Sequence, residues 1–230
     1  MARTIFIGDL HGCRRELEDL LSAVALADGD SVVAVGDLVV RGPDPVGTLA
    51  VLRRVGARAV RGNHEERLLR WYEARGTKAE PALGDMTKAT ARALSDGDFA
   101  MLKSFPLWID LPEHGLRVVH AGVEPGVPIE AQDPATLMTI RSVNRKQRAQ
   151  STRGGIPWGS VYEGPPHVVF GHNAATEPQL HAWATGIDTG CVYGGRLTAM
   201  VLAHGSSPPP PGERREVLVS VRARKAYVKI

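Results

Sequence analysis

The sequence predicts an α/β protein whose sheet begins with parallel strands, and three observations predict it. A short apolar run, a polar loop and an amphipathic helix follow one another three times between residues 3 and 74. Such a repeat places helices over the faces of a parallel sheet. From residue 108 onward, short apolar runs typical of strands dominate instead. Glycine (25) and proline (16) are abundant for 230 residues, which indicates many tight turns without low complexity.

The first part of the chain alternates predicted strands with predicted helices. Each strand is a short apolar run that ends just before a glycine, at Gly8, Gly36 and Gly62. Each helix carries apolar residues at helical spacing, and the second opens on Pro43-Asp44-Pro45, a typical helix start. The predicted strands are residues 3–7, 31–35 and 58–60, and the predicted helices are residues 14–27, 43–55 and 65–74.

Residues 76–105 interrupt this rhythm, because they are polar, rich in alanine and without a strand signal. We expect helices there, packed over the sheet edge as a cap-like segment. Residues 205–215 contain four consecutive prolines, and we expect an exposed linker or hairpin tip within a single domain of residues 1–230. Further strands are predicted at residues 108–111, 116–120, 167–170, 180–183, 186–188 and 196–202, with one or two more in 216–230.

Charge and cysteine content exclude several classes of protein. Lysine and arginine (28) barely exceed aspartate and glutamate (25), and no run of five like charges occurs, so a nucleic-acid-binding arm is not expected. Two cysteines do not make a disulfide framework, which favours a reducing compartment. The first apolar run has three residues, and no stretch approaches the roughly 18 apolar residues of a membrane helix. We therefore expect a soluble cytoplasmic protein with no membrane partner and leave its oligomeric state open.

Metal-type side chains follow five of the predicted strands. In an open α/β sheet, ligands bind in the crevice at the carboxyl ends of strands. Carboxylate, imidazole and amide ligands without thiolate suit Mn, Fe, Zn or Co. The residues are Asp9 and His11, Asp37, Asn63 and His64, His120, and His172.

Two divalent ions bridged by Asp37 would leave this site with a net charge of about +2. Such a site binds anions and lowers the pKa of a bridging water toward about 7. Arg41 follows Asp37 on the same loop and offers a planar fork to phosphate oxygens. The pattern therefore favours hydrolysis of a phosphate ester or anhydride.

Each residue also has a structural interpretation when it is taken alone. Asp9 and Asn63 are suitable helix caps, and Arg41 is an ordinary surface residue. His120 and His172 are equally compatible with hydrogen-bonded core histidines. A purely structural account requires all five strand ends to carry metal-type residues independently. We keep the structural interpretation for the histidines and cysteines outside these positions, which are His114, His167, His181, His204, Cys13 and Cys191.

Five blocks together resemble the calcineurin-like metallophosphoesterases of the phosphoprotein-phosphatase superfamily. They are Gly-Asp-Leu-His-Gly (8–12), Gly-Asp-Leu-Val-Val-Arg-Gly (36–42), Gly-Asn-His-Glu (62–65) and the two later histidines, His120 and His172. The resemblance implies a central two-sheet β-sandwich flanked by helices, an αββα fold with a dinuclear metal site at the strand ends.

The resemblance also implies roles for single residues. His64 is similar to the family's general acid, and Arg41 to one phosphate-binding arginine. A second such arginine lies between the last two histidines in the family, which indicates Arg141, with Arg153 as the alternative. The implied ligands are Asp9, His11 and Asp37 for the first ion, and Asp37, Asn63, His120 and His172 for the second.

Two segments resemble a narrower group, the ApaH-type symmetrical diadenosine-tetraphosphate hydrolases. Protein phosphatases of the superfamily usually carry aspartate before the second-block arginine, where this chain has Val40. The ApaH type also lacks that aspartate, and it shares the pattern of residues 36–43 and the closing segment 187–198.

We therefore expect an enzyme that cleaves diadenosine tetraphosphate symmetrically to two ADP through attack by a metal-activated hydroxide. The expected cofactors are two divalent ions, with manganese first and Fe, Zn, Co and Mg as alternatives. A Ser/Thr phosphoprotein phosphatase or broad phosphomonoesterase is the alternative within the same chemistry. A non-catalytic nucleotide- or metal-binding regulator is the alternative of another class. The expected partner is accordingly a small dinucleoside polyphosphate or a phosphoprotein.

Overall fold

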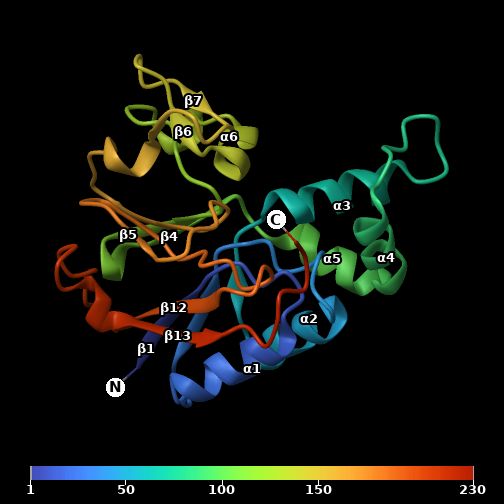
Figure 1. The fold of residues 1–230 in the computed structure, drawn as a ribbon, viewed down its shortest axis with the longest axis horizontal. Helices are drawn as coiled ribbons and strands as arrows, with labels where there is room; N and C mark the ends of the chain where they lie inside the picture. The colour runs from blue at the N-terminus through green and yellow to red at the C-terminus, as the bar shows by residue number, and fades with distance from the viewer. Residues whose placement is uncertain (1, 230) are drawn as a thin grey trace.

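Two five-stranded sheets packed face to face form the centre of the computed structural model, which describes residues 2–229 (Figure 1). The first sheet combines strands from both ends of the chain, and the second uses strands from residues 108–186. In spatial order the first sheet holds β13 (Leu218–Arg222), β12 (Arg196–Ala203), β1 (Arg3–Ile7), β2 (Ser31–Ala34) and β3 (Arg58–Ala59). The second holds β10 (Gln179–Leu180), β11 (Ala184–Gly186), β9 (His167–Phe170), β5 (Leu116–Val119) and β4 (Trp108–Leu111). The predicted fold class is confirmed.

The first sheet begins parallel, as the strand–loop–helix repeat predicted. β1 pairs with β2 in parallel, with Ile7 opposite Ala34, and β2 pairs in parallel with β3. Helices α1 (Arg14–Ala23) and α2 (Pro45–Arg54) form the connections. Because β1 and β2 end level with each other, the loops that follow them emerge at the same edge of the sheet.

The alternation of apolar residues along the central strands divides the core into layers. On β1, Ile5 and Ile7 pack with the helices, while Phe6 points between the two sheets. On β9, Val169 faces that same inter-sheet layer, while Phe170 packs on the outer side of the second sheet. Successive side chains of a strand point to opposite faces, so each central strand contributes to two layers. This arrangement fixes the strand ends rigidly with respect to one another.

Residues 76–105 are largely helical, as predicted, but they lie to one side. They form α4 (Asp85–Ala93) and α5 (Asp96–Ser104), which pack beside α3 (Asn63–Ala74) (Figure 1). Ser95 caps α5 with its hydroxyl, which accepts a hydrogen bond from the Asp98 N–H at 3.2 Å. None of these residues lines the cavity described below.

A small lobe between residues 134 and 157 was not predicted. It contains α6 (Pro134–Thr139) and a three-stranded sheet in the order β7 (Ala149–Gln150), β6 (Ser142–Val143), β8 (Ile156–Pro157). Figure 1 places this lobe above the second sheet, on the far side from β13. Its strands have two residues each, too few to show a period in the sequence.

Two strand predictions for the last third of the chain need correction. The strands expected at 180–183 and 186–188 are instead the short antiparallel pair β10 and β11, with a turn between them. The proline-rich segment 205–215 connects the antiparallel strands β12 and β13, and all of its residues except the buried Arg214 are exposed or half-buried. Met1 and Ile230, which belong to the predicted domain of residues 1–230, lie outside the described residues. Within residues 2–229, no helix has the length and apolar character needed to span a membrane.

Candidate metal centre

The carboxyl ends of strands from both sheets meet at one place. His120 follows β5 and donates from Nδ1 to the carbonyl of Val35, just beyond β2, at 2.9 Å. His172 follows β9, and its backbone N–H donates to both carboxylate oxygens of Asp9, beyond β1, at 3.0 and 3.1 Å. These contacts join the two sheets at the strand ends. The structure therefore brings together side chains that are distant in the sequence.

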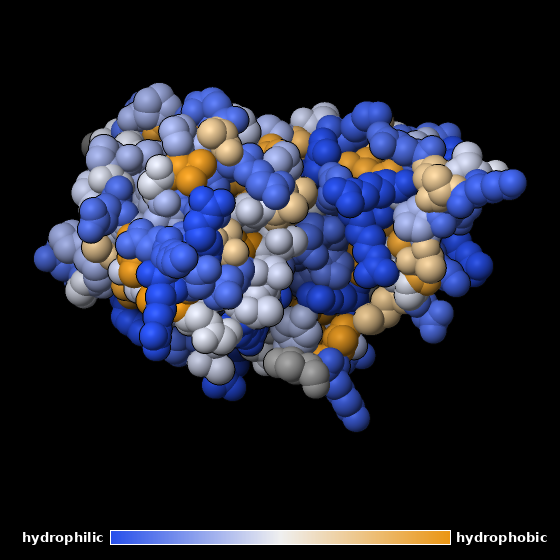
Figure 2. Space-filling model, turned by 90° about the horizontal axis from the view of Figure 1, so that it is seen from above, coloured by the Kyte–Doolittle hydropathy of each residue, from blue (hydrophilic) through white to orange (hydrophobic). Residues whose placement is uncertain are grey.

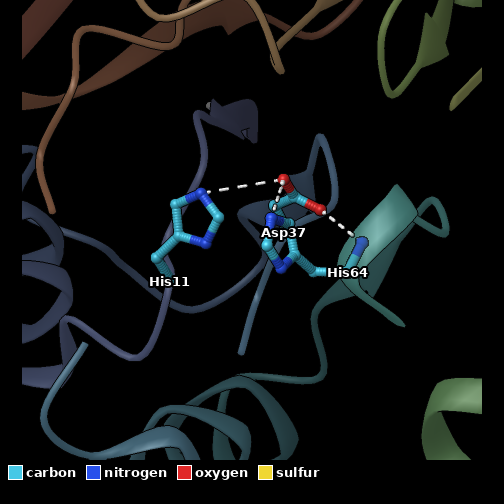
Figure 3. Close-up of side chains that lie close together, drawn as sticks. All are labelled: His11, Asp37 and His64. Atoms are coloured by element: carbon cyan, nitrogen blue, oxygen red, sulfur yellow. Dashed lines mark hydrogen bonds and ion pairs between the residues drawn. The ribbon is translucent and has the colours of Figure 1, made fainter. Parts of the chain in front are cut away.

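Asp37 lies at the centre of this group. Its Oδ2 is 3.5 Å from Nε2 of His120, 3.7 Å from Nε2 of His11 and 4.0 Å from Nε2 of His64. Figure 3 shows one oxygen of the Asp37 carboxylate directed at the rings of both His11 and His64, while the other oxygen accepts from the His64 backbone N–H. Two atoms that each lie about 2.0–2.2 Å from one ion are at most about 4.4 Å apart. These spacings are compatible with ligands that share a cation.

His172 and Asn63 complete the group on the other side of Asp37. A nitrogen of His172 lies within 4.8 Å of ligand atoms from Asp37 and His120. The Asn63 amide oxygen lies 3.1 Å from Nε2 of His120. Five of the six residues expected to bind metal therefore gather around Asp37, and Asp9 adjoins them through its bond from the His172 backbone N–H.

The loops that carry these residues adopt backbone conformations that side chains rarely tolerate. His11, Asp37 and His172 have φ values of 46°, 48° and 62°. Val40 and Arg41 follow at 69° and 73°, and a β-branched residue in this region is a clear outlier. Backbone strain of this kind concentrates at functional sites, where the surrounding structure must hold it in place.

Glu65 holds the strained Asp37 loop and was not identified from the sequence. Its carboxylate accepts hydrogen bonds from the backbone N–H groups of Asp37 and Leu38, both at 2.9 Å. It also accepts from Val39 at 3.3 Å and from Gly62 at 3.0 Å. Glu65 is fully buried, and burial together with the charge of Asp37 raises its pKa to about 7. Its position in Gly-Asn-His-Glu was the available signal, but a sequence does not show which N–H groups a carboxylate reaches.

Hydrogen bonds from Nδ1 to carbonyl oxygens leave Nε2 of His120 and His11 unprotonated, as a metal-binding nitrogen must be. A carbonyl oxygen can only accept, so the Nδ1 of His120 that faces Val35 must carry the proton. His11 Nδ1 faces the carbonyl of Val39 at 3.4 Å in the same way. Metal-binding histidines are commonly oriented by such a bond from the other nitrogen. Burial lowers the pKa of His11 to about 3 and that of His172 to about 2, so both rings are neutral.

Three buried carboxylates make this group of side chains suited to bind cations. Asp9, Asp37 and Asp188 are each at most 7% exposed. Burial, together with the charges of Asp188 and Asp37, raises the pKa of Asp9, and burial raises that of Asp188 to about 6. Burial opposes ionisation of Asp37 too, but His120 and the neighbouring histidines hold its pKa well below the usual range. Divalent cations compensate such a donor set, so the residues fit the two expected ions.

Asp188 is a second residue that the strand-end rule did not identify. It follows β11 at the same spacing as Asp9 follows β1. Its side chain lines the cavity that opens over Asp37. The sequence showed Asp188 within the segment shared with a known family, but its strand was predicted two residues too late. The four histidines expected to be structural, in contrast, lie outside the cavity; they are His114, His167, His181 and His204.

A cavity of about 380 Å³ opens over the Asp37 cluster and is lined by three arginines. Arg41 donates to His11 Nε2 at 3.1 Å, and its guanidinium lies 5.5 Å from the ring centre of Tyr193. Arg141 is half-buried and donates to the Asn173 side chain at 3.2 Å. Arg153 is exposed and donates to the carbonyl of Ala174 at 3.2 Å. The cavity can therefore bind a large anion.

His64 also lines the cavity and is held loosely. Its Nε2 faces Asp37, but its buried Nδ1 has no hydrogen-bond partner among the described residues. The residue before Arg41 is Val40, which offers no carboxylate to orient the ring. Burial lowers the pKa of His64. A neutral ring still carries one N–H that it can donate to a bound group.

The residues that line the cavity are mostly polar or charged. Seen from above, the molecule as a whole is largely hydrophilic, and apolar side chains reach this view only in small separate patches (Figure 2). Large exposed apolar patches mark sites for protein partners. The polar lining of the cavity fits a small charged ligand better than a docked apolar surface.

Comparisons with known proteins agree with this geometry. The sequence profile of the family described as "Calcineurin-like phosphoesterase" matches residues 2–206. The asymmetrical bis(5'-nucleosyl)-tetraphosphatase PrpE of Halalkalibacterium halodurans is 31% identical over 219 residues, which is 84% of this chain and 87% of that protein. The PrpE of Geobacillus thermodenitrificans is 30% identical over 84% of this chain and 88% of its own length.

Solved structures are similar as well. The crystal structure of "a putative diadenosine tetraphosphatase" is 36% identical, with a TM-score of 0.82 over 96% of this chain and 93% of that one. A protein serine/threonine phosphatase from Saccharomyces cerevisiae is 15% identical, with a TM-score of 0.58 over 96% of this chain and 79% of its own. The second likeness is one of fold alone.

Proposed function

The chain belongs to the calcineurin-like phosphoesterase family, and from this membership we propose that it hydrolyses dinucleoside tetraphosphates asymmetrically, to a nucleoside triphosphate and a nucleoside monophosphate. The observation that carries the proposal is the 31% identity to an asymmetrical tetraphosphatase across 84% of the chain. The sequence predicted symmetrical cleavage to two ADP, and that outcome remains the alternative that a product assay separates.

Six residues are proposed to hold two divalent ions. Asp9, His11 and Asp37 hold the first, and Asp37, Asn63, His120 and His172 hold the second; manganese is the first candidate. Bound divalent ions supply Lewis-acid polarisation of the phosphate and a water that is nucleophilic at neutral pH. The protein itself fixes the ligands through the strained loops at the strand ends and through Glu65.

The arginines bind and orient the polyphosphate. Arg41 and Arg141 line the cavity from different loops, so two planar guanidinium groups are available to bind one polyphosphate. Such contacts accelerate the reaction when they are stronger in the transition state, as negative charge develops on the transferring phosphoryl group. Arg153 lines the same cavity but is more exposed than Arg141, and it is proposed to contact phosphates distant from the point of cleavage.

His64 is proposed as the general acid. Its ring reaches the same cavity as the arginines, with Nε2 facing the centre of the site. An N–H at this position can transfer its proton to the oxygen of the leaving nucleotide as the anhydride bond breaks. A module that only binds nucleotides does not need such a group, which favours catalysis over regulation.

A substrate panel tests the class of substrate. The metal-loaded protein is assayed with diadenosine tetraphosphate, a phosphoserine peptide and a simple aryl phosphate at matched concentrations. We expect the highest kcat/KM with the dinucleotide. Faster turnover of the phosphopeptide would contradict the proposal and support a protein phosphatase, and no turnover of any substrate would support the non-catalytic alternative.

A further inference from the structure

A second cluster of metal-type side chains lies outside the cavity and has no part in the proposed reaction. The sulfur atoms of Cys13 and Cys191 and a carboxylate oxygen of Glu16 all lie within 4.8 Å of one another. Cys13 and Glu16 are fully buried, and Cys191 is 2% exposed. Both cysteines are free thiols.

Glu16 carries an oxygen that nothing in the described chain satisfies. Its Oε1 accepts hydrogen bonds from the Arg224 backbone N–H at 3.0 Å and from the Tyr227 hydroxyl at 2.8 Å. Its Oε2 is buried and has no hydrogen-bond partner among residues 2–229. The guanidinium of Arg224 pairs with Asp19 instead, at 2.6 Å. A buried carboxylate oxygen without a partner is costly, so this position calls for a positive group.

The cluster sits at the start of a helix, where negative ligands are favoured. Cys13 is the N-cap residue of α1, its side chain caps no N–H group, and Glu16 lies in the first turn. The N-terminus of a helix carries partial positive charge, which stabilises thiolate and carboxylate there. Cys191 approaches from the turn after β11, so the cluster joins α1 to a different part of the chain.

We propose that Cys13, Cys191 and Glu16 form a second metal site, which binds one thiophilic divalent cation such as Zn²⁺. Sulfur ligands select soft ions, whereas the site around Asp37 offers only oxygen and nitrogen. Zinc lies about 2.3 Å from sulfur and about 2.0–2.2 Å from carboxylate oxygen, so three ligand atoms around one ion lie roughly 3.6–4.0 Å apart. The three atoms here lie within 4.8 Å of one another, so binding requires their side chains to move together by at most about 1 Å.

The free carboxylate oxygen distinguishes this proposal from a disulfide. A disulfide between Cys13 and Cys191 would leave Glu16 Oε2 without a partner, whereas a cation held by both sulfurs and the Glu16 carboxylate balances the charge of that carboxylate. Each thiol gives up its proton to solvent when its sulfur binds the cation. The bound ion would then fix the start of α1 to the turn that carries Cys191. Cys13 closely follows His11 in the sequence, and Cys191 closely follows Asp188, so the ion would tie together the ends of these two loops.

The absorption of metal–thiolate bonds tests the proposal without any measurement of activity. The reduced full-length protein is stripped with a chelator, supplied with excess Mn²⁺ and titrated with Cd²⁺. We expect a thiolate-to-cadmium charge-transfer band in the ultraviolet that saturates at about one Cd²⁺ per chain. The Asp37 site cannot produce this band, so a failure of the proposed phosphohydrolase activity would leave the result unchanged.

Variants assign the band to these residues. Cys13→Ser and Cys191→Ser should each lose about half of it, and the double variant all of it. Glu16→Gln keeps both thiols and should weaken Cd²⁺ binding by roughly tenfold or more, because even residues that only support a ligand change metal affinity about 10–100-fold.

Three results would overturn the proposal. They are a reduced protein with two free thiols and no band, a band that persists in the double variant, and a disulfide already present after anaerobic purification. If the serine variants do not fold, the Glu16→Gln variant decides the question, and an unchanged affinity would then count against the site.

Discussion

The carboxylate of Glu65 accepts a hydrogen bond from the backbone N–H of Asp37 at 2.9 Å, and three further N–H groups of the same region converge on it. Replacement of Glu65 by alanine leaves these buried donors without partners. We expect a loss of about 3–5 kcal/mol in the free energy of unfolding, since each unsatisfied buried group costs about 1–3 kcal/mol. Urea denaturation of the wild-type and variant proteins measures this difference in the free energy of unfolding.

The neighbouring Glu66 provides a matched control. It forms ion pairs with Arg61 and Arg70 in a half-buried position, so Glu66→Ala should cost no more than about 1 kcal/mol. Equal losses for the two variants would show that Glu65 does not support the Asp37 loop.

Removal of the His64 ring tests the general acid. His64→Ala should retain both metal ions, because His64 is not one of the six proposed ligands. Its kcat with the dinucleotide should fall about 10²–10⁴-fold. Metal analysis and steady-state kinetics on the same preparation measure both quantities. His204→Ala, which removes an exposed histidine outside the cavity, is the control. Wild-type kcat in His64→Ala would refute the role.

The two candidate arginines of the small lobe should differ. Arg141 is half-buried and oriented by Asn173, whereas Arg153 is exposed and bonded to a backbone carbonyl. We expect Arg141→Ala to lower kcat/KM about 10²–10³-fold through kcat, and Arg153→Ala to raise KM with little effect on kcat. Arg145→Ala, on the exposed turn between β6 and β7, should change neither. The reverse order would assign the second phosphate-binding role to Arg153.

Arg214 should stabilise the fold far more than the adjacent Arg215. Its buried guanidinium donates to the carbonyls of Pro209 and His181 at 2.8 and 2.7 Å, which fixes the proline-rich segment to the second sheet. Arg214→Ala should cost about 3–5 kcal/mol in the free energy of unfolding. Arg215→Ala removes only an exposed ion pair with Glu177 and should cost less than about 1 kcal/mol. Similar costs for both variants would contradict this account.

The clustering of side chains around Asp37 was largely predictable from the sequence, because one physical rule governs the strand ends. Parallel strands end at a common edge, so polar residues after β1 and β2 had to converge in the first sheet and those after β5 and β9 in the second. Asp188 obeys the same rule, but its strand ends earlier than predicted, at Gly186. The rule therefore identifies a site residue only when the end of the preceding strand is predicted correctly.

Other features depend on contacts that local sequence patterns do not encode. The strands of the small lobe have two residues each and show no period, so the segment that carries Arg141 and Arg153 next to the cavity was not predicted. Burial of Arg214 depends on carbonyl groups from distant turns, and a run of prolines suggested exposure instead. Tertiary packing decided these elements.

The products of diadenosine tetraphosphate hydrolysis test the proposed function most directly. The Mn²⁺-loaded protein is incubated with the dinucleotide, and the products are separated by ion-exchange chromatography, with a chelator-treated sample as control. We predict equal amounts of ATP and AMP, and no products in the control. ADP as the only nucleotide product would contradict asymmetrical cleavage, and an intact dinucleotide beside a dephosphorylated phosphopeptide would contradict the substrate class as well.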